Sequence, residues 1–435
     1  MVGLSFAEIM SSGDRKKQST MSFLVGAVGR AVISGLAFYG AKKLYEDYWK
    51  GGAVSGQAVE DKPTKGPGDS ESETEEDTDI DIRPDSHRQA QPVNLLKSLE
   101  DYFESYVKPS MSEVETARKV VAELEEYVLE MLDQSCPELP IGKLIHTGSA
   151  YEDLQVITPD DFDTFLQLRL DSSQWELIDG KDTLLDSPGY ALVKRSNQEF
   201  FKVGSVPWDR FLVGYYLSPQ KILQYFQALL QRSVGPGKKR FTIEPSVKEN
   251  SLSVTVIYGS DQKLRLNIIP MVKIGDVTMA GRLHPKFALF GMDGYKNLWR
   301  RSYVEEEEAM MKSLTSQNGC QKDCLRILKA ISMNDYGSPL HLVEPYVFKT
   351  ILFHLSQIEE NWDKQVLAER VIDMFMVLDR FLDQRKLPNY FNADVNLFES
   401  YTDIYLRELK HYVNHVITRN KFSTLLRQKS PGKDF

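Results

Sequence analysis

The sequence predicts an α+β protein in which a mixed sheet with flanking helices is followed by a C-terminal helical bundle subdomain and preceded by one transmembrane helix. Three observations lead to this fold class. Residues 23–41 are almost wholly apolar, residues 145–277 mix short apolar runs with a helical pattern, and from residue 304 onward the apolar spacing is helical almost throughout. At 435 residues the chain is long enough for two or three domains.

Composition narrows the class of protein. The formal net charge is −9, from 53 basic and 62 acidic side chains, which argues against a nucleic-acid binder because such proteins usually carry a basic excess. Three cysteines, Cys136, Cys320 and Cys324, offer no paired framework and indicate a reducing compartment. Cys320 and Cys324 could form half of a zinc site, but the helical pattern around them favours two buried thiols.

The N-terminal residues 1–22 form a short polar segment, and residues 23–41 are predicted to be a retained membrane anchor. Nineteen residues in a helix span roughly 28 Å, close to the hydrocarbon thickness of a bilayer. Arg30 costs on the order of 3 kcal/mol near the centre of such a helix, and snorkelling lowers that cost. A cleaved signal or transit peptide is the alternative, but Glu8 and Asp14 do not suit a transit peptide.

Residues 51–92 are predicted to be a disordered acidic linker. They are rich in Gly, Pro, Ser and Thr, and residues 69–81 hold eight carboxylates with one apolar residue. Such a segment cannot bury enough apolar surface to offset its ordering entropy. It would allow the folded part of the chain to stand off the membrane.

The folded part is predicted to comprise a sheet-containing core at 93–303, a helical subdomain at 304–420 and a flexible tail at 421–435. Ser112 and Glu115 have the spacing of a capping box, which would start an amphipathic helix over residues 112–132. Strands are expected at 190–193, 252–257 and 264–270, and further helices at 219–232, 320–331, 345–357, 364–383 and 401–418.

A Gly-Ser turn and a strand with two aspartates follow the first long helix. Asp161 and Asp163 project from the same side of a strand, and two neighbouring carboxylates attract a cation, usually Mg²⁺ where phosphates are present. Gly148 lets backbone N–H groups turn toward an anion, and Thr147 and Ser149 add hydroxyl donors. These residues predict a nucleotide-phosphate pocket with Asp161 and Asp163 as metal ligands; the alternative is a solvated strand end.

Several longer motifs run through the anchor and residues 140–400. They are Val-Gly-Arg-Ala-Val at 28–32, Gly-Ser-Ala-Tyr-Glu-Asp-Leu-Gln-Val at 148–156, Trp-Asp-Arg at 208–210, Gly-Tyr-Tyr-Leu-Ser-Pro at 214–219 and Cys-Leu-Arg-Ile-Leu-Lys-Ala-Ile at 324–331. With these motifs the chain resembles the mitochondrial dynamics proteins of the outer membrane, which recruit the dynamin-related fission GTPase and are divergent members of the cyclic GMP-AMP synthase-like superfamily. The resemblance implies a nucleotidyltransferase-like fold for residues 93–303.

The resemblance also implies a nucleotide site. In the family member that binds ADP, the contacts fall on the positions of Thr147, Ser149, Asp161, Ser302 and Lys329. Hydroxyls and a lysine suffice to hold a diphosphate. However, Val304 stands where that member has an arginine, and Asp161 stands where it has a histidine. Binding of ADP or a related nucleotide is therefore expected to be Mg²⁺-dependent, weaker or absent.

Asn267 corresponds to the third carboxylate of the two-metal site in the active synthases that the chain resembles. An amide oxygen can ligate a metal but cannot neutralise its charge. We therefore expect a pseudo-nucleotidyltransferase, in which Asp161 and Asp163 are an ancestral remnant or a single-metal site.

The family's surface for the fission GTPase corresponds to the loop residues Gln198, Glu199, Phe200, Phe201 and Lys202. Two adjacent aromatic residues flanked by charges suit an exposed anchor in an interface. The alternative is that one of the two phenylalanines packs inward.

The predicted function is that of a single-pass outer-membrane adaptor whose cytosolic domain recruits a dynamin-related GTPase to mitochondria under control of a bound nucleoside diphosphate. The alternative is a membrane-tethered, metal-dependent nucleotidyltransferase that makes a nucleotide second messenger. Asn267 and the anchor favour the adaptor, and the intact Asp161 and Asp163 favour the enzyme. The sequence leaves open whether the chain forms a homodimer.

Overall fold

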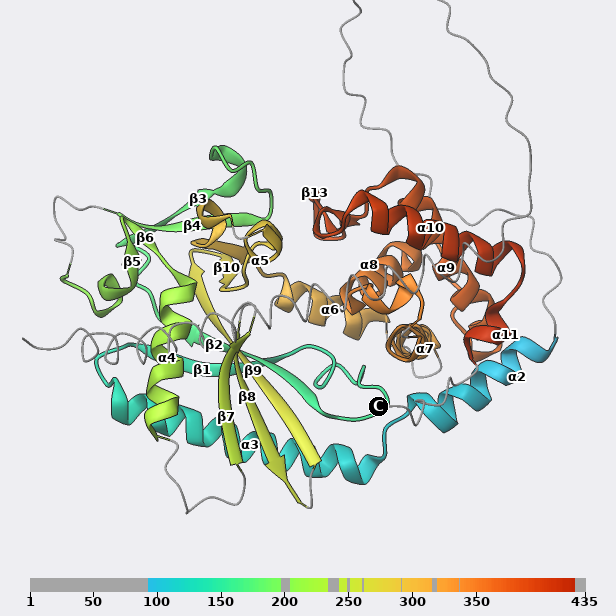
Figure 1. Ribbon diagram of the computed structural model, residues 1–435, viewed down its shortest axis with the longest axis horizontal. Coiled ribbons are helices and arrows are strands. Elements are labelled where there is room, and N and C mark those ends of the chain that lie inside the picture. The colour runs from blue at the N-terminus through green and yellow to red at the C-terminus, as the bar shows by residue number, and fades with distance from the viewer. Residues whose placement is uncertain are drawn as a thin grey trace, which may run out of the picture. The chain divides into compact units, whose positions relative to one another are not determined.

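Figure 1 shows the protein as a computed structural model. It describes residues 93–426, except 197–203, 234–241, 249–250, 260–261, 291, 315–318 and 336, and these residues belong to one compact unit. Within this part of the chain, no helix has the length and apolarity needed to cross a bilayer. The predicted anchor at 23–41 and the predicted linker at 51–92 lie outside the described residues.

A mixed sheet forms the centre of the described fold (Figure 1). Its main path runs β1-β2-β9-β10-β11-β4-β6-β5, with β3 beside β4 and with β8 between β7 and β9. Strands β2 and β9 are parallel, and their neighbours pair antiparallel. The strands are β1 (Ile141–Thr147), β2 (Asp161–Leu168), β3 (Trp175–Asp179), β4 (Tyr190–Arg195), β5 (Leu212–Val213), β6 (Tyr216–Leu217), β7 (Thr242–Lys248), β8 (Ser251–Tyr258), β9 (Gln262–Ile274), β10 (Val277–Ala280) and β11 (Leu298–Arg301).

One face of the sheet is apolar and covered by two helices. Side chains alternate between faces along a strand, so Phe162 of β2 and Leu266 of β9 point to the same side. There they pack in one core with α3 (Met111–Ser135) and α4 (Pro219–Ser233). The burial of this face leaves the opposite face of β2 and β9 for polar side chains.

The opposite face begins with carboxylates and ends in a small apolar floor. Asp161, Asp163 and Phe165 alternate along β2, and Asp163 is in register with Asn267 of β9. Phe165 and Ile269 belong to a small buried cluster farther along the strands. Because every second residue of a strand points to the same side, the two aspartates and the apolar Phe165 lie on one face of the sheet.

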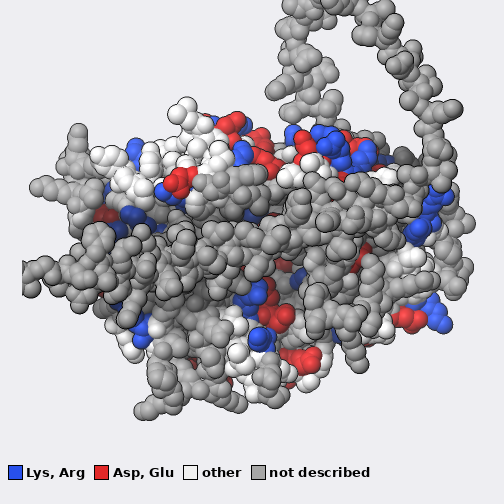
Figure 2. Space-filling model, in the orientation of Figure 1, with Lys and Arg blue, Asp and Glu red and all other residues white. Residues whose placement is uncertain are grey.

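The C-terminal residues form a helical lobe with its own large core. Its helices follow α6 (Val304–Leu314) and begin with α7 (Gln321–Asn334). The remaining elements are α8 (Pro345–Ser356), α9 (Leu367–Gln384), α10 (Asp403–Thr418), α11 (Phe422–Leu425) and the hairpin of β12 (Pro388–Asn389) and β13 (Asn392–Asn396). In Figure 2, Lys and Arg lie next to Asp and Glu over this lobe, and ion pairs there include Arg385–Asp403 and Lys410–Asp383.

The first described helix packs with the helical lobe although it is distant in sequence. Leu95 and Leu99 of α2 (Val93–Tyr102), and Val107 at the end of the following π-helical turn, lie in the same core as α7, α8 and α9. Figure 1 shows α2 beside α11. The predicted subdomain boundary at 303/304 stays a prediction, because the core on its C-terminal side includes residues from the start of the fold.

The predicted start of the first long helix is wrong. Helix α3 begins at Met111 with Ser110 at its N-cap, so Ser112 lies in the first turn and does not form the predicted capping box with Glu115. Instead, the Ser112 hydroxyl lies 2.9 Å from the hydroxyl of Ser110. Both serines are suitable N-cap residues, and their spacing alone does not decide which one ends the extended segment.

Other predicted elements are confirmed with shifted ends. Residues 364–366 form a 3₁₀ turn before α9, and α10 begins at Asp403 because the Thr402 hydroxyl accepts a hydrogen bond from the Tyr405 N–H. Strand β9 is longer than predicted, since it pairs with three neighbours. Cys320 and Cys324 are buried thiols, as predicted, and Cys136 is buried as well.

Candidate functional site

The Gly-Ser turn lies beside the carboxylate strand. Thr147, at the end of β1, is in register with Asp163 of β2, and Gly148 then takes a φ of 81°. That left-handed conformation suits glycine, because a side chain would be strained there. A Cβ on Gly148 would lie 3.6 Å from Asp163 Oδ2. The backbone of Ser149 then closes the turn, since its carbonyl accepts from the Leu154 N–H at 2.8 Å.

Asn267 bridges the two aspartates. Its Nδ2 donates to Asp161 Oδ1 and to Asp163 Oδ1, both at 2.9 Å, and its Oδ1 accepts from the Ser253 hydroxyl at 2.7 Å. This orientation directs N–H groups, rather than a lone pair, at the carboxylates. The predicted same-side placement of Asp161 and Asp163 is confirmed, and an amide nitrogen lies against both.

Two basic side chains lie near this carboxylate pair. Arg282 Nη2 lies 3.5 Å from Asp163 Oδ2, and Lys329 Nζ donates to the Leu154 carbonyl at 3.4 Å. Burial lowers the pKa of Lys329, against the opposing effect of Asp161 and Asp163. Desolvation of the Asp161 carboxyl raises its pKa, and the nearby charge of Asp163 raises it further. Part of this side chain is nevertheless open to solvent. The predicted residue Lys329 therefore lies in the electrostatic field of the predicted aspartates.

The donor set does not suit Mg²⁺. This ion prefers six oxygen ligands in near-octahedral geometry. Both protons of the Asn267 amide nitrogen are directed at carboxylate oxygens, and Arg282 adds a positive charge beside Asp163. Within the described residues, no three His, Cys, Asp or Glu side chains gather as a metal site would require. The two carboxylates instead accept hydrogen bonds from one amide, and Asp163 lies beside a guanidinium.

Ser302 and Val304 follow β11, which lies two strands away from β9 in the sheet. The Ser302 N–H donates to the Thr278 carbonyl of β10, and Val304 begins α6. Val304 packs on the small apolar cluster that contains Phe165, Ile269 and Ala280. This valine therefore supports the sheet face farther along from the carboxylates.

A buried ammonium joins the Gly-Ser turn to two helices. Lys349 of α8 donates to both carboxylate oxygens of Glu152 at 2.9 and 2.8 Å, and to Glu307 Oε2 at 2.8 Å. Glu152 follows the Gly-Ser turn, and Glu307 lies in the first turn of α6. Burial by itself would lower the pKa of Lys349, but the charges of Glu307 and Glu152 raise it. The lysine thus fixes the turn relative to the helical lobe.

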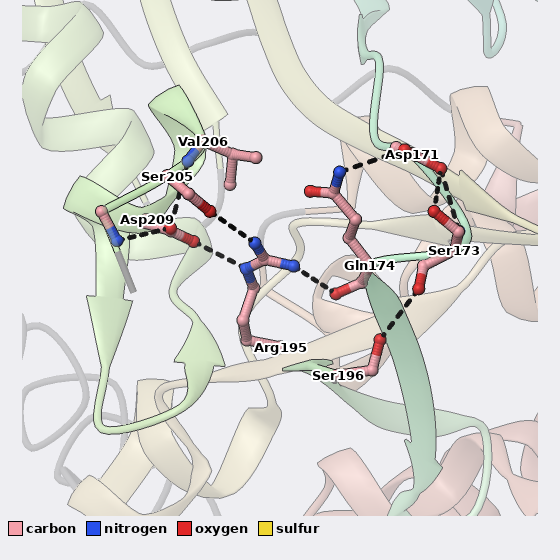
Figure 3. Close-up of polar contacts among 9 residues, drawn as sticks. Asp171, Ser173, Gln174, Arg195, Ser196, Ser205, Val206 and Asp209 are labelled. Atoms are coloured by element: carbon pink, nitrogen blue, oxygen red, sulfur yellow. Dashed lines mark hydrogen bonds and ion pairs between the residues drawn. The ribbon is translucent and has the colours of Figure 1, made fainter. Parts of the chain in front are cut away.

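A second polar cluster lies at the C-terminal end of β4 (Figure 3). Arg195 is fully buried; its Nε donates to Asp209 Oδ1 at 2.9 Å and its Nη1 to the Gln174 carbonyl at 2.9 Å. Asp209 Oδ2 in turn accepts from the Gly204 N–H at 2.7 Å. The same guanidinium donates to the Ser205 hydroxyl at 3.2 Å. This ion pair anchors the backbone where the described chain resumes at Gly204.

The predicted partner residues Gln198, Glu199, Phe200, Phe201 and Lys202 lie outside the described residues. Their described flanks are fixed on both sides. The Ser196 N–H donates to the Gln174 carbonyl at 2.9 Å, and Gly204 bonds to Asp209. Arg195 contacts both Gln174 and Asp209, so a single side chain supports the two flanks.

Two cavities border η3 (Pro207–Phe211), which follows this cluster. The larger, of about 460 Å³, is lined by Glu138 and Arg210, whose side chains form an ion pair at 2.6 Å. The smaller, of about 280 Å³, is lined by Trp175 and Trp208. Both belong to the surface near the flanks of the predicted partner loop.

Sequence reasoning missed Arg282, Lys349 and Arg195 as members of these sites. Arg282 belongs to no recognisable motif, although a glycine precedes it. Lys349 lies 197 residues from its partner Glu152. A weak signal did exist for Arg195, because it and Lys194 end an apolar strand run.

The fold and the site together define a class of protein. The mixed sheet with flanking helices is consistent with a nucleotidyltransferase-like fold. Residues 112–307 match the family described as the C-terminal domain of mitochondrial dynamics protein MID51-like proteins, and residues 320–416 match the Mab-21 protein HhH/H2TH-like domain.

The individual relatives identify the family. The chain is 30% identical to mitochondrial dynamics protein MID51 of Danio rerio over 324 residues, which cover 73% of this chain and 68% of that protein. It is 30% identical to mitochondrial dynamics protein MID49 of Xenopus laevis over 311 residues, covering 70% and 65%. Cyclic GMP-AMP synthase-like receptor 3 of Stylophora pistillata is 22% identical over 339 residues, covering 74% and 95%. The chain belongs to the mitochondrial dynamics protein MID49/MID51 family.

Proposed function

We propose that this chain is an adaptor of mitochondrial fission that recruits a dynamin-related GTPase to the outer membrane. A single anchor at residues 23–41 would hold it there, with the folded domain in the cytosol. The domain would bind ADP or a related nucleotide and perform no nucleotidyl transfer. Membership of the mitochondrial dynamics family supports this proposal.

The bridge formed by Asn267 is the single structural observation that carries the non-catalytic part of the proposal. Metal-dependent nucleotidyl transfer requires carboxylates to hold and neutralise the ions that activate the attacking and leaving oxygens. Here an amide nitrogen donates to both Asp161 and Asp163. An ion at this place would face N–H groups, so the geometry favours a domain that binds without catalysing.

Nucleotide binding is supported by the donors around the Gly-Ser turn. Thr147 and Ser149 would supply hydroxyls beside a glycine in the left-handed conformation, and Lys329 would supply an ammonium near the carboxylates. Ser302, in the segment that follows β11, would add a further hydroxyl. A bound diphosphate would accept hydrogen bonds from these donors and would connect the sheet to Lys329 of α7.

Partner binding is supported by the anchored flanks of residues 197–203. A loop whose ends are fixed loses less conformational entropy when its tip binds. The Arg195–Asp209 pair supplies such a base, and Phe200 and Phe201 would supply the aromatic contacts.

Recruitment can be tested with the full chain in phospholipid vesicles and a purified dynamin-related GTPase, measured by co-sedimentation. The double variant Phe200→Ala/Phe201→Ala is expected to lose most of the bound GTPase. Tyr215→Ala is the matched control, because Tyr215 is an exposed aromatic residue on the neighbouring turn. If the double variant bound as much GTPase as Tyr215→Ala does, the proposed partner surface would be contradicted.

Catalysis can be tested on the same samples by pyrophosphate release from ATP and GTP with Mg²⁺. We expect none. Release that disappears in Asp163→Asn would establish the alternative, a membrane-tethered nucleotidyltransferase making a nucleotide messenger.

A further inference from the structure

The carboxylate of Asp163 is shared between the Gly-Ser turn and an arginine. Its Oδ2 lies 3.5 Å from Arg282 Nη2, and the same oxygen would lie 3.6 Å from a Cβ on Gly148. The guanidinium and the turn therefore border one oxygen atom. An anion held by the turn would lie within reach of Arg282.

The pair between Arg282 and Asp163 is loose enough to exchange partners. The two side chains are 36% and 34% exposed, and their separation is at the long limit of a hydrogen bond. Solvent screens such a pair strongly. A phosphate offers a guanidinium two oxygens at once, which is a stronger arrangement than this single contact.

We propose that Arg282 binds the phosphate of the nucleotide directly and supplies the positive charge that a metal ion would otherwise supply. In the protein without nucleotide, Arg282 pairs with Asp163. On binding, the guanidinium transfers to the phosphate, and Asn267 keeps both aspartates satisfied. Nucleotide binding is consequently independent of Mg²⁺. This inference rests on the proposed nucleotide binding and adds its counter-ion.

The test is isothermal titration of the full chain in detergent with ADP, in excess EDTA and again with Mg²⁺. We expect the same dissociation constant in both. Arg282→Gln should weaken binding by about tenfold or more, because a charge-assisted hydrogen bond to phosphate is lost. Asp163→Asn should tighten binding, because it removes the competing carboxylate. Arg282→Lys, which keeps the charge but not the planar fork, should lie between wild type and Arg282→Gln.

Lys273→Gln is the matched control. Lys273 is also on this sheet, is 43% exposed and pairs at 3.8 Å with Glu305. The control variant therefore removes one positive charge from a loose ion pair, as Arg282→Gln does. Its dissociation constant should equal that of wild type. Binding that needs Mg²⁺, or an Arg282→Gln variant that binds like Lys273→Gln, would overturn the role of Arg282 and leave nucleotide binding itself intact. If the wild-type chain binds no ADP in either buffer, the proposed nucleotide binding and this inference fall together.

Discussion

Two arginine–aspartate pairs in this protein have the same chemistry and opposite settings. Arg195 and Asp209 meet at 2.9 Å with side chains 0% and 2% exposed. Arg282 and Asp163 meet at 3.5 Å with about a third of each side chain exposed. The first pair also bonds to backbone groups on both of its members, whereas the second borders the phosphate turn.

The difference teaches that burial decides whether an ion pair is structural or exchangeable. A buried pair has already lost its hydration, so removing one partner leaves an uncompensated charge. A half-exposed pair keeps water as an alternative partner and contributes little by itself. The pair at Arg195 therefore suits a fixed base, and the pair at Arg282 suits a ligand-binding position.

The largest effect is expected when the buried pair is broken. Arg195→Met should lower the free energy of unfolding by about 3–5 kcal/mol, because it leaves the Asp209 carboxylate buried without its guanidinium. Chemical denaturation of the full chain measures this change. The double variant Arg195→Met/Asp209→Leu should recover much of the loss. A single-variant loss below about 1 kcal/mol would place this pair in the same class as Arg282–Asp163.

The second effect concerns Lys349, whose side chain is 9% exposed between Glu152 and Glu307. Lys349→Met should cost about 3 kcal/mol, because it leaves two poorly solvated carboxylates close together. Lys312→Met is the control, since Lys312 forms an exposed ion pair on α6 and its loss should not shift the unfolding midpoint. Equal midpoints for the two variants would contradict the rule that burial decides.

A third prediction uses pH and concerns a buried imidazole. His284 is 3% exposed between the rings of Tyr190 and Tyr295, and its Nδ1 accepts from the Lys286 N–H. Burial lowers its pKa to about 4, with Glu399 opposing and Lys286 reinforcing the shift.

Between pH 6.5 and 4 the unfolded chain therefore binds a proton at His284 that the folded protein does not. Stability should be complete above pH 6.5 and should fall by about 2 kcal/mol by pH 5. His284→Phe should flatten this slope when unfolding is followed at several pH values. An unchanged slope would assign the dependence to other groups.

The smallest effect is expected at the exposed pair. Arg282→Gln should change the free energy of unfolding by less than about 1 kcal/mol, although it weakens ADP binding. A loss as large as that of Arg195→Met would show that Arg282 is structural. Such a loss of stability would contradict the proposed transfer of Arg282 from Asp163 to phosphate.

Much of the fold was predictable because its signals are local. The apolar periodicity of α3, α4 and α9 follows from a repeat of 3.6 residues, and the shared face of Asp161 and Asp163 follows from a repeat of two. The ends of helices were less predictable, as Ser110 and Ser112 show, because neighbouring residues compete for the N-cap.

The sequence by itself determined the class of the fold, the carboxylate strand and the Gly-Ser turn, since each depends on residues only a few positions apart. Only the tertiary structure decided which groups meet these residues. Asn267 reaches Asp161 because β2 and β9 run parallel in one register, and Lys349 reaches Glu152 because α8 packs beside the turn. Such contacts carry no local periodicity, because they depend on how the chain as a whole buries its apolar faces.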